Sequence, residues 1–147
     1  MRAAGLITQS RLSVALGLLL GLSVGSAAAD VVVVVSAQSP LTTLTREQVV
    51  DIFLGKTSRF PDGSRAVPID RLEGSAQRDE FYLKFAVRSP AQVKAHWSKI
   101  IFTGRGQPPQ EIASASELKK AIAENPNAIG YMEQKLVDAS VKVLLAQ

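Results

Sequence analysis

Five consecutive valines, Val31 to Val35, constrain the fold of this sequence more than any other feature. β-Branched side chains favour extended backbone, and an uninterrupted apolar run of this length is typical of a buried strand. A helix pattern follows, because Thr45 and Gln48 have the spacing of a capping box and apolar residues recur at helical spacing until Gly55. We therefore expect a buried strand and then a helix at the start of the folded part.

Strand and helix patterns alternate along the rest of the chain. Residues 66–70 have the pattern of a short strand, Ser75 is a plausible N-cap, and Pro90 suits the first turn of a further helix. The residues expected to face the core from these helices are Phe81, Tyr82, Phe85, Val93, Trp97, Ile100 and Ile101. We further expect a loop over 103–109, a helix from a Ser114–Glu117 capping box to Asn125, and strands over 128–132 and 141–145. This alternation predicts an α/β layer structure.

Residues 1–29 have the composition of a cleavable secretory signal peptide. Arg2 and Arg11 carry its charges, a short apolar run follows, and Ala27 to Ala29 supply the small residues that a signal peptidase requires. The run is shorter than the ~20 residues of a membrane-spanning helix. The sequence also has no cysteine that could carry a lipid. We therefore expect one domain over residues 30–147, a periplasmic or secreted location, and no membrane anchor after cleavage.

The charge and cysteine content argue against a nucleic-acid partner and exclude stabilisation by disulfide bonds. The net charge is +4, but without the two leader arginines 15 basic residues remain against 13 acidic ones. No basic run is present, so we expect no nucleic-acid partner. Export permits disulfides, yet the chain contains no cysteine. The domain must therefore be held together by its hydrophobic core, for which its length is sufficient.

Residues 71–77 carry the strongest chemical signal. A predicted helix begins at Ser75, and the first amides of a helix lack internal partners and favour a negative charge. Gly74 lets the backbone approach a ligand, and the guanidinium of Arg71 matches two oxygens of a phosphate group. The candidate oxyanion-binding residues are Arg71, Gly74, Ser75, Ala76 and Gln77. A purely structural alternative stays open, in which Ser75 only caps the helix and Arg71 pairs with Glu73 or Asp79.

Other residues give weaker signals. His96 has no cysteine and no second histidine near it, so a polar structural role is favoured over a metal site. No nucleophile-elbow motif surrounds Ser75, which argues against a hydrolytic triad with His96. We therefore expect no enzyme and no cofactor. Lys56 and Arg105 lie in predicted loops, where they either line a binding face or are solvated.

Five short segments resemble, in order, the second half of the phosphate-binding proteins of phosphate ABC transporters. These proteins have the type II periplasmic binding fold. The segments are Val31–Val35 with Pro40-Leu41 and Leu44-Thr45; Asp51 to Lys56; Phe60 to Gly63; Arg71 to Gln77; and Asn125 to Tyr131. The resemblance implies a single lobe of this fold, with a mixed sheet flanked by helices.

The resemblance also implies a function. In the family's R-x-x-G-S-G-T phosphate-binding pattern, Arg71, Gly74 and Ser75 match, whereas Ala76 replaces a glycine and Gln77 replaces a threonine. We expect no second lobe, and hence an open half-site that binds phosphate or a similar oxyanion weakly, at about millimolar concentration. The implied role is phosphate uptake or sensing, with an ABC permease as a possible partner. Alternatives are an envelope protein-interaction module without ligand binding, or a cleft completed by a second copy or a partner chain.

Overall fold

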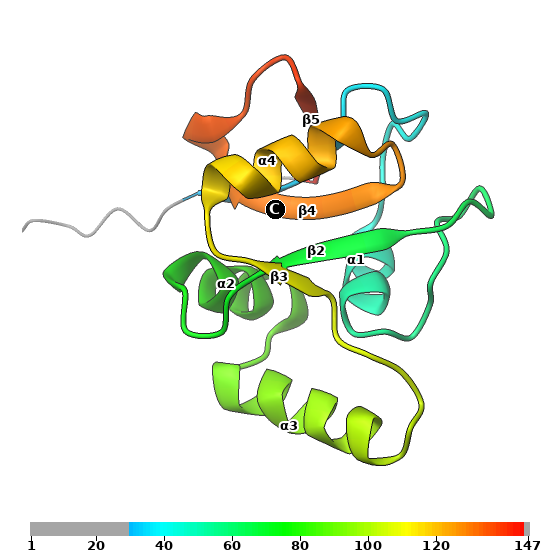
Figure 1. The fold of residues 1–147 in the computed structure, drawn as a ribbon, viewed down its shortest axis with the longest axis vertical. Helices are drawn as coiled ribbons and strands as arrows, with labels where there is room; N and C mark the ends of the chain where they lie inside the picture. The colour runs from blue at the N-terminus through cyan, green and yellow to red at the C-terminus, as the bar shows by residue number, and fades with distance from the viewer. Residues whose placement is uncertain (1–29, 146–147) are drawn as a thin grey trace, which may run out of the picture.

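A computed structural model describes residues 30–145 and shows a five-stranded mixed sheet flanked by helices (Figure 1). The strands are β1 (Val31–Ser36), β2 (Val67–Arg71), β3 (Gln110–Ile112), β4 (Ala128–Glu133) and β5 (Val141–Leu145). The helices are α1 (Arg46–Phe53), α2 (Ala76–Phe81), α3 (Pro90–Phe102) and α4 (Ala115–Glu124), with a π-helical turn η1 (Tyr82–Ala86) and a 3₁₀ turn η2 (Gln134–Leu136). The strand order is β3-β2-β4-β1-β5. β2 runs parallel to β3 and β4, whereas β1 is antiparallel to β4 and β5.

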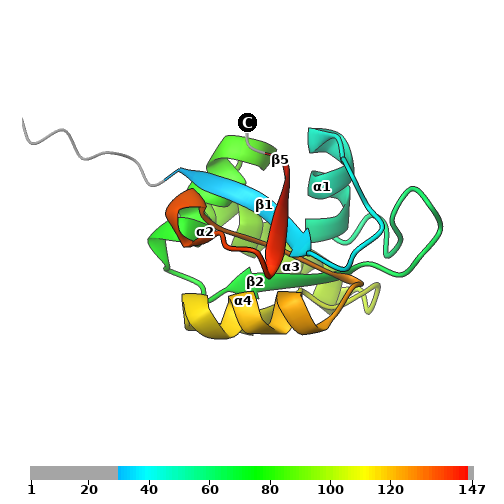
Figure 2. The ribbon, with the colours of Figure 1, turned by 90° about the horizontal axis from the view of Figure 1, so that it is seen from above.

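The valine run forms β1, which lies between β4 and β5 and is fully buried. Helices α1 and α2 cover one face of the sheet and α4 covers the other, whereas α3 lies beyond the edge formed by β3 (Figure 1, Figure 2). Because side chains alternate along a strand, Val31, Val33 and Val35 belong to the core beneath α1 and α2. Val93 and Trp97 of α3 complete this core. Val32 and Val34 belong to the core beneath α4. An unbroken apolar strand is therefore required, since both faces of β1 are covered.

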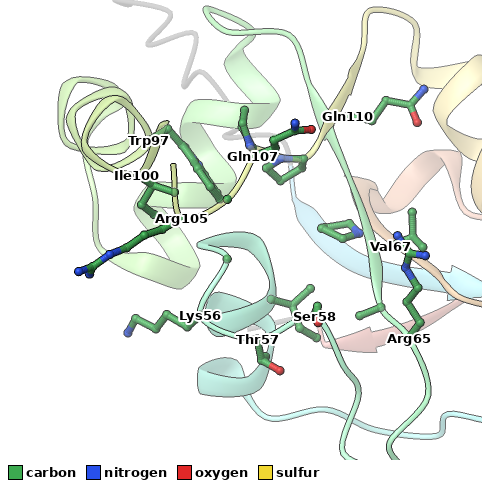
Figure 3. A pocket seen from close by; sticks show the side chains of 17 residues that line it. Lys56, Thr57, Ser58, Arg65, Val67, Trp97, Ile100, Arg105, Gln107 and Gln110 are labelled. Carbon is green, nitrogen blue, oxygen red and sulfur yellow. The ribbon is translucent and has the colours of Figure 1, made fainter. Parts of the chain in front are cut away.

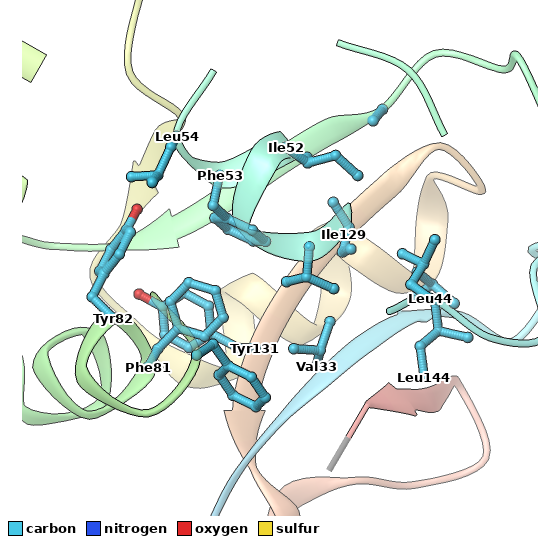
Figure 4. Packing of buried hydrophobic residues seen from close by; sticks show 14 of the residues in the cluster. Val33, Leu44, Ile52, Phe53, Leu54, Phe81, Tyr82, Ile129, Tyr131 and Leu144 are labelled. Carbon is cyan, nitrogen blue, oxygen red and sulfur yellow. The ribbon is translucent and has the colours of Figure 1, made fainter. Parts of the chain in front are cut away.

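Aromatic rings fasten α1 and α2 to the sheet (Figure 4). The ring of Phe81 stacks on that of Tyr131 from β4, with centroids 4.1 Å apart. The ring of Phe53 meets Phe81 edge-on at 4.7 Å. Such pairs contribute roughly 0.5–1.5 kcal/mol each beyond the burial of their area. They hold the end of α2 against β4 and against the end of α1.

Two expectations about helix geometry are wrong. The helix that begins at Ala76 changes to a π-helical turn at Tyr82, so Tyr82 and Phe85 are buried but do not lie on one continuous α-helix. Ile101 is 56% exposed, because α3 buries only the side that carries Val93 and Trp97.

Two further features differ from the sequence analysis. Ser114 caps α4 by accepting a hydrogen bond from the amide of Glu117, but the reciprocal bond of a capping box is not formed. Strand β3 directly follows the predicted loop over 103–109, and the sequence analysis predicted no strand there. This strand has three partly or fully exposed residues at the edge of the sheet, so neither apolar alternation nor length distinguishes it from a loop.

Within residues 30–145, no helix is both long and apolar enough to cross a membrane. The expected signal peptide, residues 1–29, lies outside the described residues. Its cleavage and the resulting domain boundary stay predictions.

Candidate functional site

The predicted half-site lies where β2 ends and α2 begins. As predicted, Ser75 is the N-cap of α2, and its hydroxyl oxygen accepts a hydrogen bond from the amide of Arg78 at 3.3 Å. Gly74 has φ +88°, a left-handed conformation that side-chain-bearing residues adopt at a cost. A Cβ at Gly74 would meet no atom within 4 Å, so the glycine is required by the backbone conformation and its surroundings are open.

Three hydrogen-bond donors converge at this helix start. The amides of Ala76 and Gln77 have no hydrogen-bond acceptor in the described part of the chain, as is usual in the first turn. Within residues 30–145 the hydroxyl of Ser75 accepts from Arg78 and donates to no acceptor, so its own proton remains available. Ala76 is exposed and Ser75 and Gln77 are half-buried, which leaves these donors within reach of a solute.

The guanidinium of Arg71 is held by the loop that directly follows β3. Its Nη2 donates to the carbonyl of Ala113 at 2.8 Å, and its Nε is buried without an acceptor within residues 30–145. The alternative pairings are wrong. Glu73 instead pairs with Lys94 at 3.2 Å, and no ion pair joins Asp79 to Arg71 in the described structure. One buried N–H of Arg71 therefore lacks an acceptor.

An acidic residue that the sequence analysis missed lies next to Gln77. The side-chain Nε2 of Gln77 donates to Glu133 Oε1 at 2.9 Å, so this amide group is already engaged. Hydrogen bonds from Lys135 and from Gln77 hold the pKa of Glu133 below its usual value. An ionised carboxylate therefore lies beside the half-site and opposes the binding of an anion.

A buried polar cluster beneath the half-site was also missed. Asp70, the residue before Arg71, is fully buried and accepts hydrogen bonds from the hydroxyls of Tyr131 and Tyr82. The amide of Arg71 donates to the same carboxylate at 2.9 Å, and Arg78 Nε lies 3.6 Å from it. Burial raises the pKa of Asp70, while the hydrogen bonds from the two tyrosines oppose this rise. The cluster joins the end of β2 to α2, η1 and β4.

His96 contacts the backbone rather than other titratable groups. Its Nε2 lies 2.8 Å from the carbonyl oxygen of Leu54. In the described residues no group of three or more His, Cys, Asp or Glu side chains is placed to hold a metal ion.

The mixed five-stranded sheet with helices on both faces matches a single lobe of the fold of phosphate-binding proteins. The solved structures that resemble it include an ABC-type phosphate transport receptor from Vibrio cholerae (TM-score 0.62, 22% identity, 78% of this chain and 45% of that one). A putative phosphate ABC transporter substrate-binding protein from Clostridium perfringens, with bound phosphate, matches with a TM-score of 0.63 and 23% identity over 78% of this chain and 44% of that one. PstS from Borrelia burgdorferi matches with a TM-score of 0.54 and 16% identity over 79% of this chain and 46% of that one.

These matches confirm the expected fold class, and the chain spans less than half of each matching protein. No model of a protein family and no curated protein matches the sequence. At such identities the likeness concerns the fold, so the ligand is argued from the residues themselves.

Proposed function

We propose that this protein is an exported, non-enzymatic binding domain that holds phosphate or a similar oxyanion weakly at the start of α2. Two observations carry the proposal: the amides of Ala76 and Gln77 have no acceptor in the described structure, and the positive charge of Arg71 acts on Glu133, which is hydrogen-bonded to Gln77. The resemblance in fold to proteins named for phosphate transport supports the same ligand class. A role in phosphate uptake or sensing, with an ABC permease as partner, follows from that resemblance.

The geometry favours weak binding. Hydrogen bonds to a charged group contribute roughly 1.5–3 kcal/mol each, and exposure reduces this value. Two or three of them, opposed by the carboxylate of Glu133, correspond to about millimolar affinity. Selective binding of phosphate at low concentration would need further hydrogen-bonding groups from a second copy or a partner chain.

Titration calorimetry with phosphate and with sulfate tests the proposal. We expect a Kd of about 1 mM for phosphate and roughly tenfold weaker binding for Arg71→Gln. Glu133→Gln keeps an acceptor for Gln77 but removes the charge, so it should tighten binding about threefold. Arg46→Gln, a change at an exposed arginine on α1, is the matched control and should bind as the unaltered protein does. Absence of binding at about 10 mM phosphate, or equal binding by Arg71→Gln and the control, would refute the ligand role.

A protein-interaction role is the second candidate, favoured by one surface feature. Phe102 is 93% exposed and follows Ile101, which is 56% exposed, so α3 ends in an uncovered apolar pair. Capture of an envelope protein that is lost in Phe102→Ser and retained in Arg71→Gln would favour this role. Capture lost in Arg71→Gln alone would favour the half-site.

Export is inferred from residues 1–29. Sequencing the N-terminus of the protein recovered from the cell envelope or medium tests it. The expected first residue is Asp30, and a start at Met1 would contradict the inference.

A further inference from the structure

A cavity of about 490 Å³ lies between the end of α1, the end of α3, the start of β2 and the loop before β3 (Figure 3). Its volume is in the range of sites for small organic molecules. Val67 and Pro68 of β2 line it, whereas the half-site follows the other end of this strand at Arg71. At about 3.3 Å per residue, the two places are roughly 10 Å apart along β2. The cavity is therefore separate from the half-site.

The wall of the cavity contains a buried hydrogen-bond donor without a partner. Trp97 is only 5% exposed, and its Nε1 is buried with no acceptor within residues 30–145. In Figure 3 its ring extends from α3 toward α1 along the cavity. A buried indole N–H normally finds a partner, and leaving it unpaired is costly. An acceptor brought by a ligand would satisfy this donor.

A glycine at the end of α1 leaves the space that the ring of Trp97 occupies. Gly55 has φ +73°, and a Cβ at this position would lie 2.7 Å from Cη2 of the ring. A side chain here would force the indole to move. The absence of one lets the indole pack against the α1 terminus and form a fixed wall.

The cavity has a positive rim. Its 17 lining residues include Lys56, Arg65 and Arg105 but no aspartate or glutamate. Lys56 pairs with Asp51 at 3.3 Å, whereas no ion pair or side-chain hydrogen bond of Arg65 or Arg105 is found in the described structure. Lys56 and Arg105 lie on one side of the cavity with their side chains extending outward, and Arg65 lies on the other side (Figure 3). Guanidinium groups without a carboxylate partner, at the rim of a cavity that opens to solvent, favour an anionic ligand.

We propose that this cavity is a second binding site, for a small organic anion such as an aryl phosphate or aryl carboxylate. An oxygen of the ligand accepts a hydrogen bond from Trp97 Nε1, and Arg65 and Arg105 balance the charge. The apolar part of the ligand covers Ile100 and Pro109 in the wall. Both the apolar wall and the charged rim are needed, so neither inorganic phosphate nor a neutral aromatic molecule fits the site as well.

Trp97 is the single tryptophan of the chain, so its fluorescence reports this cavity directly. We expect phenyl phosphate to change that fluorescence saturably, and benzyl alcohol to bind at least about fivefold more weakly. Arg65→Gln and Arg105→Gln should each weaken phenyl phosphate binding roughly threefold to fivefold, whereas Arg46→Gln should not. Trp97→Phe keeps an aromatic ring but lacks the N–H, and calorimetry should show roughly tenfold weaker binding.

Two results would overturn the proposal. One is the absence of a saturable signal, in both fluorescence and calorimetry, up to about 10 mM phenyl phosphate. The other is an affinity for benzyl alcohol equal to that for phenyl phosphate, or an affinity for phenyl phosphate that Arg65→Gln and Arg105→Gln leave unchanged. Arg71→Gln separates this site from the half-site. This variant should leave phenyl phosphate binding at Trp97 intact. If binding is instead lost in Arg71→Gln and retained in Arg65→Gln and Arg105→Gln, the ligand belongs to the half-site and the cavity site is refuted.

Discussion

Asp70 is the residue on which the geometry of the half-site depends most. Its carboxylate is fully buried and binds groups from the end of β2, from α2, from η1 and from β4. Arg78, only 8% exposed, links this carboxylate to Glu111 through a contact of 2.9 Å. A buried ion pair is weak evidence for added stability, but removing one partner leaves the other charge uncompensated. Asp70 therefore has a positioning role, fixing the end of β2 relative to α2.

Replacing Asp70 with asparagine tests this role. The asparagine side chain would keep the shape but remove the buried charge beside Arg78, which would keep its ion pair with Glu111, and it would replace one acceptor oxygen that the tyrosine hydroxyls use. We therefore expect a loss of about 3 kcal/mol in the free energy of unfolding. Urea unfolding followed by circular dichroism measures it. Asp79→Asn, at a half-buried aspartate on the same helix as Arg78, is the control and should change stability by less than about 0.5 kcal/mol. Equal effects of the two substitutions would contradict the positioning role.

Among the elements, η1 shows the greatest departure from regular geometry. It is a π-helical turn capped at its C-terminal end by Val87, whose φ of 53° and ψ of 46° lie in the left-handed region. β-Branched residues adopt that region at a cost of roughly 1–2 kcal/mol. Since Val87 is 73% exposed, it offers little packing in return. The turn places Tyr82 against Asp70 and Phe85 in the core. The packing of these two aromatic residues therefore offsets the backbone strain at Val87.

Val87→Gly removes the steric cost and loses little buried surface. After the entropy cost of glycine is subtracted, we expect a net stabilisation of about 1 kcal/mol and a rise in Tm of about 4 °C. Differential scanning calorimetry measures the change. Val87→Ala keeps the Cβ and should have a smaller effect. A decrease in Tm for Val87→Gly would mean that the side chain contributes more than its exposure indicates.

At the scale of the whole molecule, the two hydrophobic cores lie on opposite faces of the same sheet, and β1, β4 and β5 each contribute side chains to both. The alternating valines of β1 pack into both of them, and α4 reaches the second core through Leu118 and Ile122. Gly130 on β4 lets α4 approach closely, because a Cβ there would lie 2.5 Å from Cδ1 of Ile122. With these strands shared between them, neither core can open without disturbing the other.

We therefore expect a single unfolding transition, even when only the core beneath α4 is weakened. Leu118→Ala should lower the free energy of unfolding by about 3 kcal/mol. The fluorescence of Trp97, in the opposite core, should report the same shifted midpoint as circular dichroism. Two separate midpoints would show that the cores unfold independently.

The sequence by itself determined the features that depend on neighbouring residues. The buried character of β1, the capping of α1 by Thr45 and the cap of α2 at Ser75 follow from local sterics and local hydrogen bonds, and each is confirmed. The α/β class follows from their alternation. The location of the candidate half-site was inferred in the same way, because its residues lie within one short segment.

Only the tertiary structure decided the contacts between distant segments. Gln77 meets Glu133, Asp70 meets Tyr131, and the guanidinium of Arg71 meets the carbonyl of Ala113, each across a separation of 42 residues or more. The exposure of Ile101 and the cavity beside Trp97 likewise depend on how α3 packs. Local patterns carry no information on such pairings, since the order of the strands in the sheet sets which side chains meet.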